Sequence, residues 1–247
     1  MLKVTTTKEV ISTGIREISE ELGGGIRPGT LMFIEGQSES GKSVLAQHLA
    51  CGALRGFEKG AVAYYTSEYS VAGLIKQMDS LSLGVTEHFL ADRLRIYPMT
   101  VRNYFGETQK YLLQVLLAHL SRLPERFQLV IIDSVTLFLT HAKLRPTLDF
   151  FQGCRELCQQ DRTVVLVANS LALGKETLSR AFDLSDDYLA LRTEDALQES
   201  DQLEQRVLKV LEVTKLNGAL RPRRSVIRFE IRPKTGIHIL PFLKVNV

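Results

Sequence analysis

Residues 36–43 read Gly36-Gln37-Ser38-Glu39-Ser40-Gly41-Lys42-Ser43, which fits the pattern G-x-x-x-x-G-K-S/T at every fixed position. The apolar run TLMFIE at 30–35 precedes the motif and predicts a buried strand, while apolar residues at helical spacing follow it from Lys42 to about Leu54. A strand, a glycine-rich loop and a helix in this order are typical of a phosphate-binding loop, in which backbone N–H groups and the helix N-terminus form a concave anion site. The motif therefore predicts that the chain binds a nucleoside triphosphate.

The residue types of this loop have separate chemical tasks. Gly36 and Gly41 allow backbone angles and a close approach that a side chain would block. We expect the Lys42 ammonium between the β- and γ-phosphates, and the Ser43 hydroxyl on Mg²⁺, which prefers hard oxygen ligands. The predicted ATP contacts are Gly36, Gln37, Ser38, Glu39, Ser40, Gly41, Lys42, Ser43 and Val44.

Glu39 is unusual in such a loop, because a carboxylate in a phosphate cradle is electrostatically unfavourable unless it points outward. One interpretation is a solvated side chain on the outer rim of the loop. The other is a contact with a partner, or a role in slowing turnover.

Three polar residues follow predicted buried strands. Asp133 ends the run LVIID and is the expected second Mg²⁺ anchor, since ligands bind at the carboxyl ends of the strands in open α/β sheets. Glu68 and Asn169 are the candidate catalytic residues: Glu68 follows AVAYYTS and could polarise the attacking water, and Asn169 follows VVLVA and could sense the γ-phosphate. The alternatives are a turn or cap role for Asp133, a surface position for Glu68 and local loop bonds for Asn169.

Apolar runs alternate with helical patterns along most of the chain. Strands are predicted at 30–35, 61–67, 94–98, 127–133 and 163–168, and helices at 42–54, 71–81, 112–120 and 146–158. This alternation predicts an α/β fold with a central, mostly parallel sheet flanked by helices. Short strands at 207–214, 225–232 and 236–240 favour antiparallel strands on one edge of that sheet. Residues 1–29 are expected to form a lead-in loop, and residues 1–247 a single domain.

The composition limits the classes of protein to which the chain can belong. It has 247 residues, of which 45% are apolar and 24% charged, and this excludes intrinsic disorder. The net charge of +3 offers no electrostatic argument for nucleic acid or a membrane surface. Cys51, Cys154 and Cys158 are expected to be buried free thiols, as in a reducing compartment. No apolar stretch approaches the ~20 residues of a membrane-spanning helix, so we expect a cytoplasmic protein.

Taken together, these motifs resemble those of the RecA/KaiC family of P-loop ATPases along nearly the full chain. Ser12-Thr13-Gly14-Ile15 followed by Leu22-Gly23-Gly24-Gly25-Ile26 is similar to the opening of KaiC-type domains, and so is Thr66-Ser67-Glu68. Within this family the chain looks most like the ATP-binding accessory proteins of the archaellum motor, on residues 40–54, on 74–81 with 92–98, and on 210–219 with 227–242.

The resemblance implies a RecA-like fold that binds ATP and Mg²⁺. It places Gly36–Ser43 on the phosphates, Asp133 in the second metal-binding motif and Glu68 at the catalytic glutamate position. It also implies a regulator whose partners are the hexameric motor and secretion ATPase, the membrane platform protein and the cytoplasmic scaffold ring of the archaellum. Such a protein would lie in the cytoplasm at the inner face of the cell membrane, and could itself form a hexameric ring.

Three departures from the family pattern point to weak or absent hydrolysis. KaiC-type domains commonly carry Lys-x-Arg on a late strand, which reaches the nucleotide of a neighbouring subunit. Here the sequence is Lys215-Leu216-Asn217, so Lys215 could make that trans contact but the arginine is missing. Glu68 is followed by Tyr69, where KaiC-like sites often have a second glutamate, and Glu39 lies in the loop. A cationic finger contributes strongly to phosphoryl transfer, so its loss should slow turnover.

Two other functions stay open. The first is a ring-forming ATPase with real turnover or autophosphorylation. The second is a RecA-like DNA-binding paralogue, which would need basic loops after the strands that end at Asp133 and Asn169. The basic residues there are Lys143, Arg145, Lys175 and Arg180. In the second loop they are offset by Glu176, Asp183, Asp186 and Asp187, which argues against a track for nucleic-acid phosphates.

Overall fold

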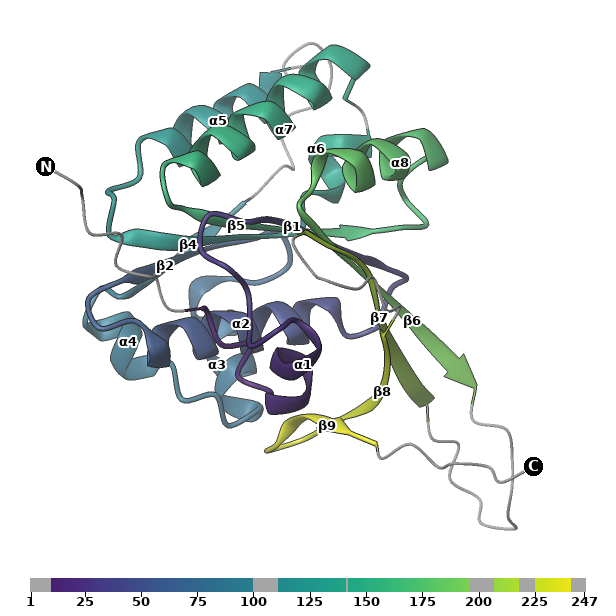
Figure 1. Ribbon diagram of the computed structural model, residues 1–247. Coiled ribbons are helices and arrows are strands. Elements are labelled where there is room, and N and C mark those ends of the chain that lie inside the picture. Colours follow the sequence, from purple (N-terminus) through teal and green to yellow (C-terminus); the bar gives the residue numbers. More distant parts are fainter. Residues whose placement is uncertain (1–9, 100–110, 141, 196–206, 218–224, 241–247) are drawn as a thin grey trace, which may run out of the picture.

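The computed structural model describes residues 10–99, 111–140, 142–195, 207–217 and 225–240 of the chain. Among these residues, nine strands form one sheet in the order β3-β2-β4-β5-β1-β6-β7-β8-β9 (Figure 1). The strands are β1 (Leu31–Gly36), β2 (Ala61–Thr66), β3 (Leu94–Pro98), β4 (Phe127–Asp133), β5 (Thr163–Asn169), β6 (Asp187–Asp195), β7 (Val207–Leu216), β8 (Ser225–Arg232) and β9 (Gly236–Ile239).

Helices lie on both sides of the sheet. They are α1 (Arg16–Glu21), α2 (Lys42–Gly56), α3 (Val71–Ser80), α4 (Thr86–Leu90), α5 (Leu112–Ser121), α6 (Thr136–Thr140), α7 (Leu144–Gln159) and α8 (Lys175–Leu184). In Figure 1, α1 to α4 lie below the sheet and α5 to α8 above it. None of the helices in the described residues is long and apolar enough to cross a bilayer.

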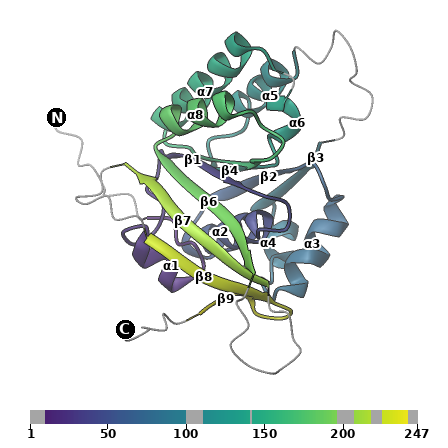
Figure 2. The ribbon, with the colours of Figure 1, turned by 90° about the vertical axis from the view of Figure 1, so that its right-hand side faces the viewer.

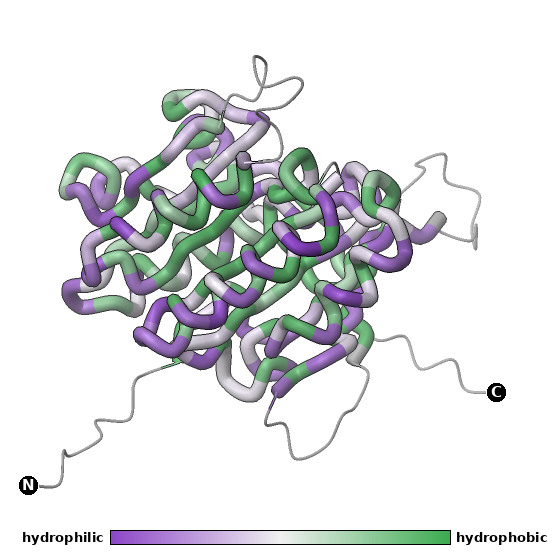
Figure 3. The backbone as a smooth tube through the Cα atoms, turned by 90° about the horizontal axis from the view of Figure 1, so that it is seen from above, coloured by the Kyte–Doolittle hydropathy of each residue, from purple (hydrophilic) through white to green (hydrophobic). Residues whose placement is uncertain are grey.

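The parallel part of the sheet runs from β3 to β6, and its central strands β2, β4, β5 and β1 are buried on both faces. Along β1, Met32 and Ile34 belong to the hydrophobic core under the sheet, whereas Leu31 and Phe33 belong to the core above it. A strand buried on both faces must be apolar at successive positions, which explains why these strands read as continuous apolar runs. Figure 3 shows the hydrophobic segments gathered inside the molecule and the hydrophilic ones toward its periphery.

The register brings the polar strand ends to one edge of the sheet. Thr66, at the end of β2, is opposite Asp133, and Gly36, at the end of β1, is opposite Asn169. Because the strands are parallel, their carboxyl ends meet, and the crevice beyond these ends is where ligands bind in sheets of this kind. The fold therefore gathers the candidate site residues of β1, β2, β4 and β5.

The antiparallel part begins at β6, which is parallel to β1 and antiparallel to β7. β8 and β9 follow in antiparallel order. In β8 the buried residues Ile227 and Phe229 alternate with the exposed Arg228, as expected for strands with one core face and one solvent face. Figure 2 shows β6 to β9 from the side on which none of the helices formed by the described residues covers them.

The predicted fold class is confirmed, with corrections to individual elements. The expected lead-in loop contains α1, and Ile11 pairs with Ile26 in an isolated antiparallel bridge. α8 and β6 were not predicted. β6 mixes charged and apolar residues, and its pairing with β1, which is distant in the sequence, leaves no local signal. α7 begins at Leu144 rather than at Pro146, since a proline in the first turn lacks only an N–H that the helix does not use. The three cysteines are buried and free, as expected.

Candidate functional site

The loop between β1 and α2 depends on its two glycines. A Cβ atom on Gly36 would lie 2.2 Å from the carbonyl oxygen of Leu191 on β6, so no side chain fits there. Gly41 has a φ of 95°, in the left-handed region that glycine favours, and no side chain caps the helix that begins after it. The first N–H groups of α2 therefore lack a side-chain partner, which is the arrangement of an anion site at a helix N-terminus.

Lys42 is the buried cation of this loop, with only 9% of its surface exposed. Its ammonium donates to the carbonyl oxygen of Gln37 at 2.5 Å and lies 3.4 Å from the Ser40 hydroxyl oxygen. Burial lowers the pKa of Lys42, and the carboxylates of Asp133 and Glu68 act in the opposite direction. Phosphate oxygens could replace the contacts that the ammonium makes within the loop, because charged acceptors form stronger hydrogen bonds than carbonyls.

Asp133 meets Ser43 beside the loop. The Ser43 hydroxyl donates to Asp133 Oδ1 at 3.1 Å, and the Tyr64 hydroxyl donates to Asp133 Oδ2 at 2.7 Å. Burial raises the pKa of Asp133 to about 6, while the hydrogen bonds from Tyr64 and Ser43 lower it. The carboxylate is therefore oriented by two neighbours and poorly solvated, so a nearby cation would stabilise its charged form.

The oxygen donors at this point suit Mg²⁺. Hydroxyl and carboxylate oxygens are hard ligands, and Mg²⁺ in nucleotide sites takes one or two protein oxygens and completes its shell with water and phosphate. In the described part of the chain, no group of three or more His, Cys, Asp or Glu side chains could hold a metal alone. Ser43 and Asp133 therefore fit a magnesium ion that is bound together with a nucleotide.

Glu68 lies just beyond the end of β2, with its side chain exposed. Its backbone N–H donates to Thr66 Oγ1 at 3.3 Å. The Glu68 charge raises the pKa of both Lys42 and Asp133, so its carboxylate lies within electrostatic reach of the loop. The structure thus brings Glu68 to the same edge of the sheet as the phosphate loop, and within the described part of the chain no side-chain hydrogen bond fixes its orientation.

Asn169, at the end of β5, contacts the loop directly. Its Nδ2 atom donates to the Ser38 hydroxyl at 3.0 Å, and its Oδ1 atom accepts from the backbone N–H of Leu171 at 3.0 Å. The backbone N–H of Asn169 donates to the Thr136 hydroxyl at 2.9 Å. The side chain therefore makes the local loop bond that we considered as an alternative, and also touches the phosphate loop.

Lys215 lies near the end of β7, opposite Tyr188 at the beginning of β6. Its ammonium donates to the carbonyl oxygens of Phe182 and Ser185 at 2.8 and 2.6 Å, and lies 5.2 Å from the centre of the Phe182 ring. These carbonyls lie at the end of α8, where a cation interacts favourably with the helix dipole. Within one chain, Lys215 therefore stabilises the end of α8.

Two residues near the loop were missed by the sequence reasoning. Tyr64 was assigned only to a buried strand, although a tyrosine in a fully buried run must find a partner for its hydroxyl, and that requirement is a usable signal. Lys209 on β7 donates to the backbone carbonyl oxygen of Glu39 in the loop. No local pattern could reveal this contact, because the two residues are 170 positions apart.

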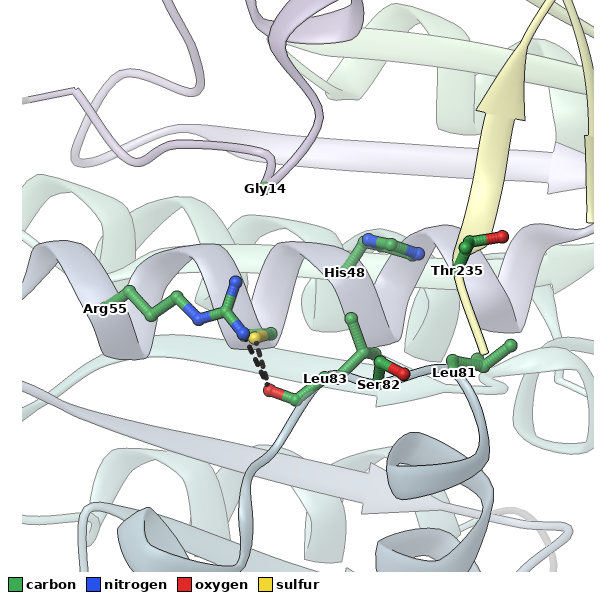
Figure 4. A pocket seen from close by; sticks show the side chains of 8 residues that line it. Gly14, His48, Arg55, Leu81, Ser82, Leu83 and Thr235 are labelled. Atoms are coloured by element: carbon green, nitrogen blue, oxygen red, sulfur yellow. Dashed lines mark hydrogen bonds between the residues drawn. The ribbon is translucent and has the colours of Figure 1, made fainter. Parts of the chain in front are cut away.

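A separate cavity of about 160 Å³ lies along α2, away from the loop (Figure 4). Gly14, His48, Cys51, Arg55, Leu81, Ser82, Leu83 and Thr235 line it. The Cys51 thiol and the Arg55 guanidinium both donate to the carbonyl oxygen of Leu83 at 3.0 Å. None of the predicted site residues lines this cavity, so it lies outside the proposed chemistry.

Comparison with known proteins gives a family and relatives. A family model described as "ATPase: KaiC" matches residues 11–244. The archaeal flagellar ATP-binding protein FlaH of Sulfolobus acidocaldarius is 25% identical over 234 residues, which cover 94% of this chain and 97% of that protein. The DNA repair and recombination protein RadB of Pyrococcus abyssi is 25% identical over 233 residues, 91% of this chain and 92% of that protein.

A solved structure has the same fold. The crystal structure of the flagellar accessory protein FlaH from Methanocaldococcus jannaschii matches with a TM-score of 0.78 and 22% sequence identity, over 95% of this chain and 100% of that one. At this level of identity the match concerns the fold alone. It agrees with the mostly parallel sheet and the antiparallel strands at its edge.

Proposed function

The chain belongs to the KaiC family of ATPases, and from this premise we propose that it is an ATP-binding accessory component of the archaellum motor. The contact between Ser43 and Asp133 beside an uncapped helix N-terminus is the observation that carries the nucleotide part. The assignment to the archaellum is supported by the similarity to the FlaH of Sulfolobus acidocaldarius over nearly the whole of both chains.

The site residues have distinct roles in this proposal. Residues Gly36–Val44 surround the phosphates of ATP, and the Lys42 ammonium neutralises part of their charge. Ser43 and Asp133 hold Mg²⁺, which when bound screens the phosphate oxygens. Glu68 orients a water molecule near the γ-phosphate. Asn169, which donates to the Ser38 hydroxyl, responds to the presence of the γ-phosphate through this contact.

Hydrolysis in this proposal is slow or absent. Glu68 is exposed, and among the described residues no side-chain hydrogen bond orients it as a base. Lys215, the candidate for a trans contact with a neighbour's nucleotide, is bound to the end of α8 within its own chain. It would have to leave those carbonyls to reach another subunit. Bound ATP then acts mainly as a ligand that favours one of two states.

The proposed partner that distinguishes these two states is the hexameric motor and secretion ATPase at the cytoplasmic face of the membrane. The platform protein and the scaffold ring are further proposed partners, and a homo-hexameric ring is a proposed assembly. The test is a binding assay between the purified chain and the motor ATPase with ATP, with ADP and with the Lys42→Ala variant. Tighter binding with ATP supports the proposal, and equal affinity in all three conditions refutes it.

A ring-forming ATPase with real turnover is the alternative within the same family. It requires Glu68 to act as the general base, and the position of Glu68 just beyond the end of β2, which pairs with the Asp133 strand, favours that role. Phosphate release by the wild type and its loss in Glu68→Gln, with ATP binding intact, would establish this alternative. Equal background rates in both proteins would exclude it.

The similarity to RadB gives a specific reason to test DNA binding. The basic residues that would line a DNA track are partly neutralised, because Arg145 pairs with Asp149 at 3.1 Å and Arg180 pairs with Glu176. Association with DNA that weakens steeply with salt would favour a RadB-like function. The archaellum proposal expects no such binding at physiological salt.

A further inference from the structure

Lys209 reaches the phosphate loop from the antiparallel part of the sheet. It lies on β7 opposite Thr193 of β6 and Phe229 of β8, and its side chain is partly buried. Its ammonium donates to the backbone carbonyl oxygen of Glu39. Glu39 has a φ of 62°, in the left-handed region that a non-glycine residue adopts rarely, so the loop needs support at this point.

The same sheet also packs against the other end of the loop. A Cβ atom on Gly41 would lie 3.2 Å from side-chain carbons of both Phe229 and Ile231 on β8. The loop is therefore held from outside at two points, by an apolar contact at Gly41 and by a cation at Glu39. Both contacts come from strands that carry none of the phosphate-loop motif.

The contact with Glu39 determines the direction of a neighbouring N–H group. The carbonyl of Glu39 and the N–H of Ser40 belong to one planar trans peptide, so they point to opposite sides. A cation fixed on the Glu39 carbonyl therefore keeps the Ser40 N–H on the opposite side, toward the Gln37 carbonyl oxygen that also accepts from the Lys42 ammonium. That N–H has only a long bond of 3.3 Å to the Gln37 carbonyl oxygen, so it is available to an anion in the loop.

The charges around the loop also favour an anion. The Lys209 ammonium lowers the pKa of Lys42, which means that two positive charges lie within electrostatic reach of each other. Burial lowers the pKa of Lys209, and the charge of Glu39 acts in the opposite direction. The sequence places Glu39 in the loop itself, and its backbone carbonyl is the group that Lys209 contacts.

We propose that Lys209 is a positioning residue of the nucleotide site, which holds the peptide between Glu39 and Ser40 for phosphate binding. The inference rests on the proposed function, because it requires that the loop bind ATP. It assigns to the antiparallel strands a direct part in nucleotide binding, through a contact on the outside of the loop.

The experiment is a calorimetric titration of Mg-ATP into wild-type protein, Lys209→Met, Lys209→Arg and the control Lys234→Met. Loss of one charge-assisted hydrogen bond should weaken ATP binding roughly tenfold in Lys209→Met. Lys209→Arg, which keeps the cation, should restore most of the affinity. Lys234→Met removes an exposed charge from the β8–β9 turn and should bind like the wild type.

A double variant tests the role of Glu39. Without Lys209, the Glu39 carboxylate is uncompensated beside the phosphates, so Lys209→Met with Glu39→Gln should bind ATP more tightly than Lys209→Met alone. Wild-type affinity in Lys209→Met would overturn the proposal. Equal loss in Lys209→Met and Lys209→Arg, together with a lower unfolding temperature, would show a merely structural role. If the wild type binds no ATP, the proposed function fails first and this inference with it.

Discussion

The central strand β4 and the late strand β8 show how the parallel and the antiparallel parts of the sheet differ in burial and in function. In β4, residues 129–132 are all fully buried, because helices cover both faces of the parallel part. In β8, Arg228 is exposed between the buried Ile227 and Phe229 and pairs with Glu194 at 3.2 Å. The parallel part provides the core and carries the chemical groups at its strand ends. The antiparallel part has an open face and supports the phosphate loop from outside.

The largest expected difference between the two parts is in core stability. Ile131→Ala in β4 removes a fully buried side chain between β2 and β5 and should lower the free energy of unfolding by about 2–5 kcal/mol. Urea denaturation followed by circular dichroism measures the change. A loss well below 1 kcal/mol would mean that the parallel part is not the rigid core described here.

The next effect tests the hydroxyl that orients Asp133. Tyr64→Phe leaves Asp133 Oδ2 without its donor, which should cost about 1–3 kcal/mol of stability. It should also raise the pKa of Asp133 further and weaken the Mg²⁺ dependence of ATP binding. The matched control is Tyr65→Phe, whose hydroxyl contacts His119 Nδ1 at 2.7 Å on the other face of β2. Identical Mg²⁺ dependence in both variants would contradict the orienting role of Tyr64.

A pH effect tests the junction between α2 and the antiparallel part. His48 Nε2 accepts the backbone N–H of Ile237 on β9 at 3.2 Å, and burial lowers the His48 pKa to about 4. In the unfolded chain the His48 imidazole is protonated below about pH 6.5, whereas in the folded chain it is protonated only below about pH 4. The contribution of His48 to stability is therefore complete above about pH 6.5 and decreases as the pH falls below that value.

The expected fall is on the order of 1–2 kcal/mol between pH 6.5 and 5. Asp187, whose pKa is raised to about 6 by burial, has the opposite effect, so the measurement compares two proteins rather than one profile. In His48→Gln an amide oxygen can accept the same N–H without titrating. Unfolding curves of wild type and variant should therefore diverge below pH 6.5, and parallel curves would contradict the prediction.

The smallest effect is expected on the open face. Arg228→Ala removes an exposed ion pair with Glu194 and should change the free energy of unfolding by no more than about 0.5 kcal/mol. A loss comparable to that of Ile131→Ala would show that the open face is covered in solution, and the contrast between the two parts would disappear.

The parallel part was largely predictable from the sequence, and the antiparallel part was less so. A strand such as β4, buried on both faces, leaves a continuous apolar run, and the phosphate loop is a local motif whose position between β1 and α2 follows from the chain itself. Asp133 could be inferred from its place at the end of that run. β6 mixes charges with apolar residues, and its neighbours β1 and β7 are known only once the sheet has formed.

The parts of the candidate site that escaped prediction depend on distant contacts. Tyr64 meets Asp133 across 69 positions, and Lys209 meets Glu39 across 170, so neither contact produces a periodicity or spacing. Lys215 could be singled out by its likeness to a family motif, yet its attachment to the end of α8 depends on packing between β7 and α8. Sequence identifies the groups that can do chemistry, and tertiary structure determines which of them face each other.

The central claim is that the loop of residues 36–43 binds ATP through Lys42. The direct measurement is a calorimetric titration of Mg-ATP into folded wild-type protein and into folded Lys42→Ala. We predict saturable binding at one site per chain in the wild type, and a loss of roughly a hundredfold or more in the variant. No heat of binding in the folded wild type, or equal affinity in both proteins, would contradict the account.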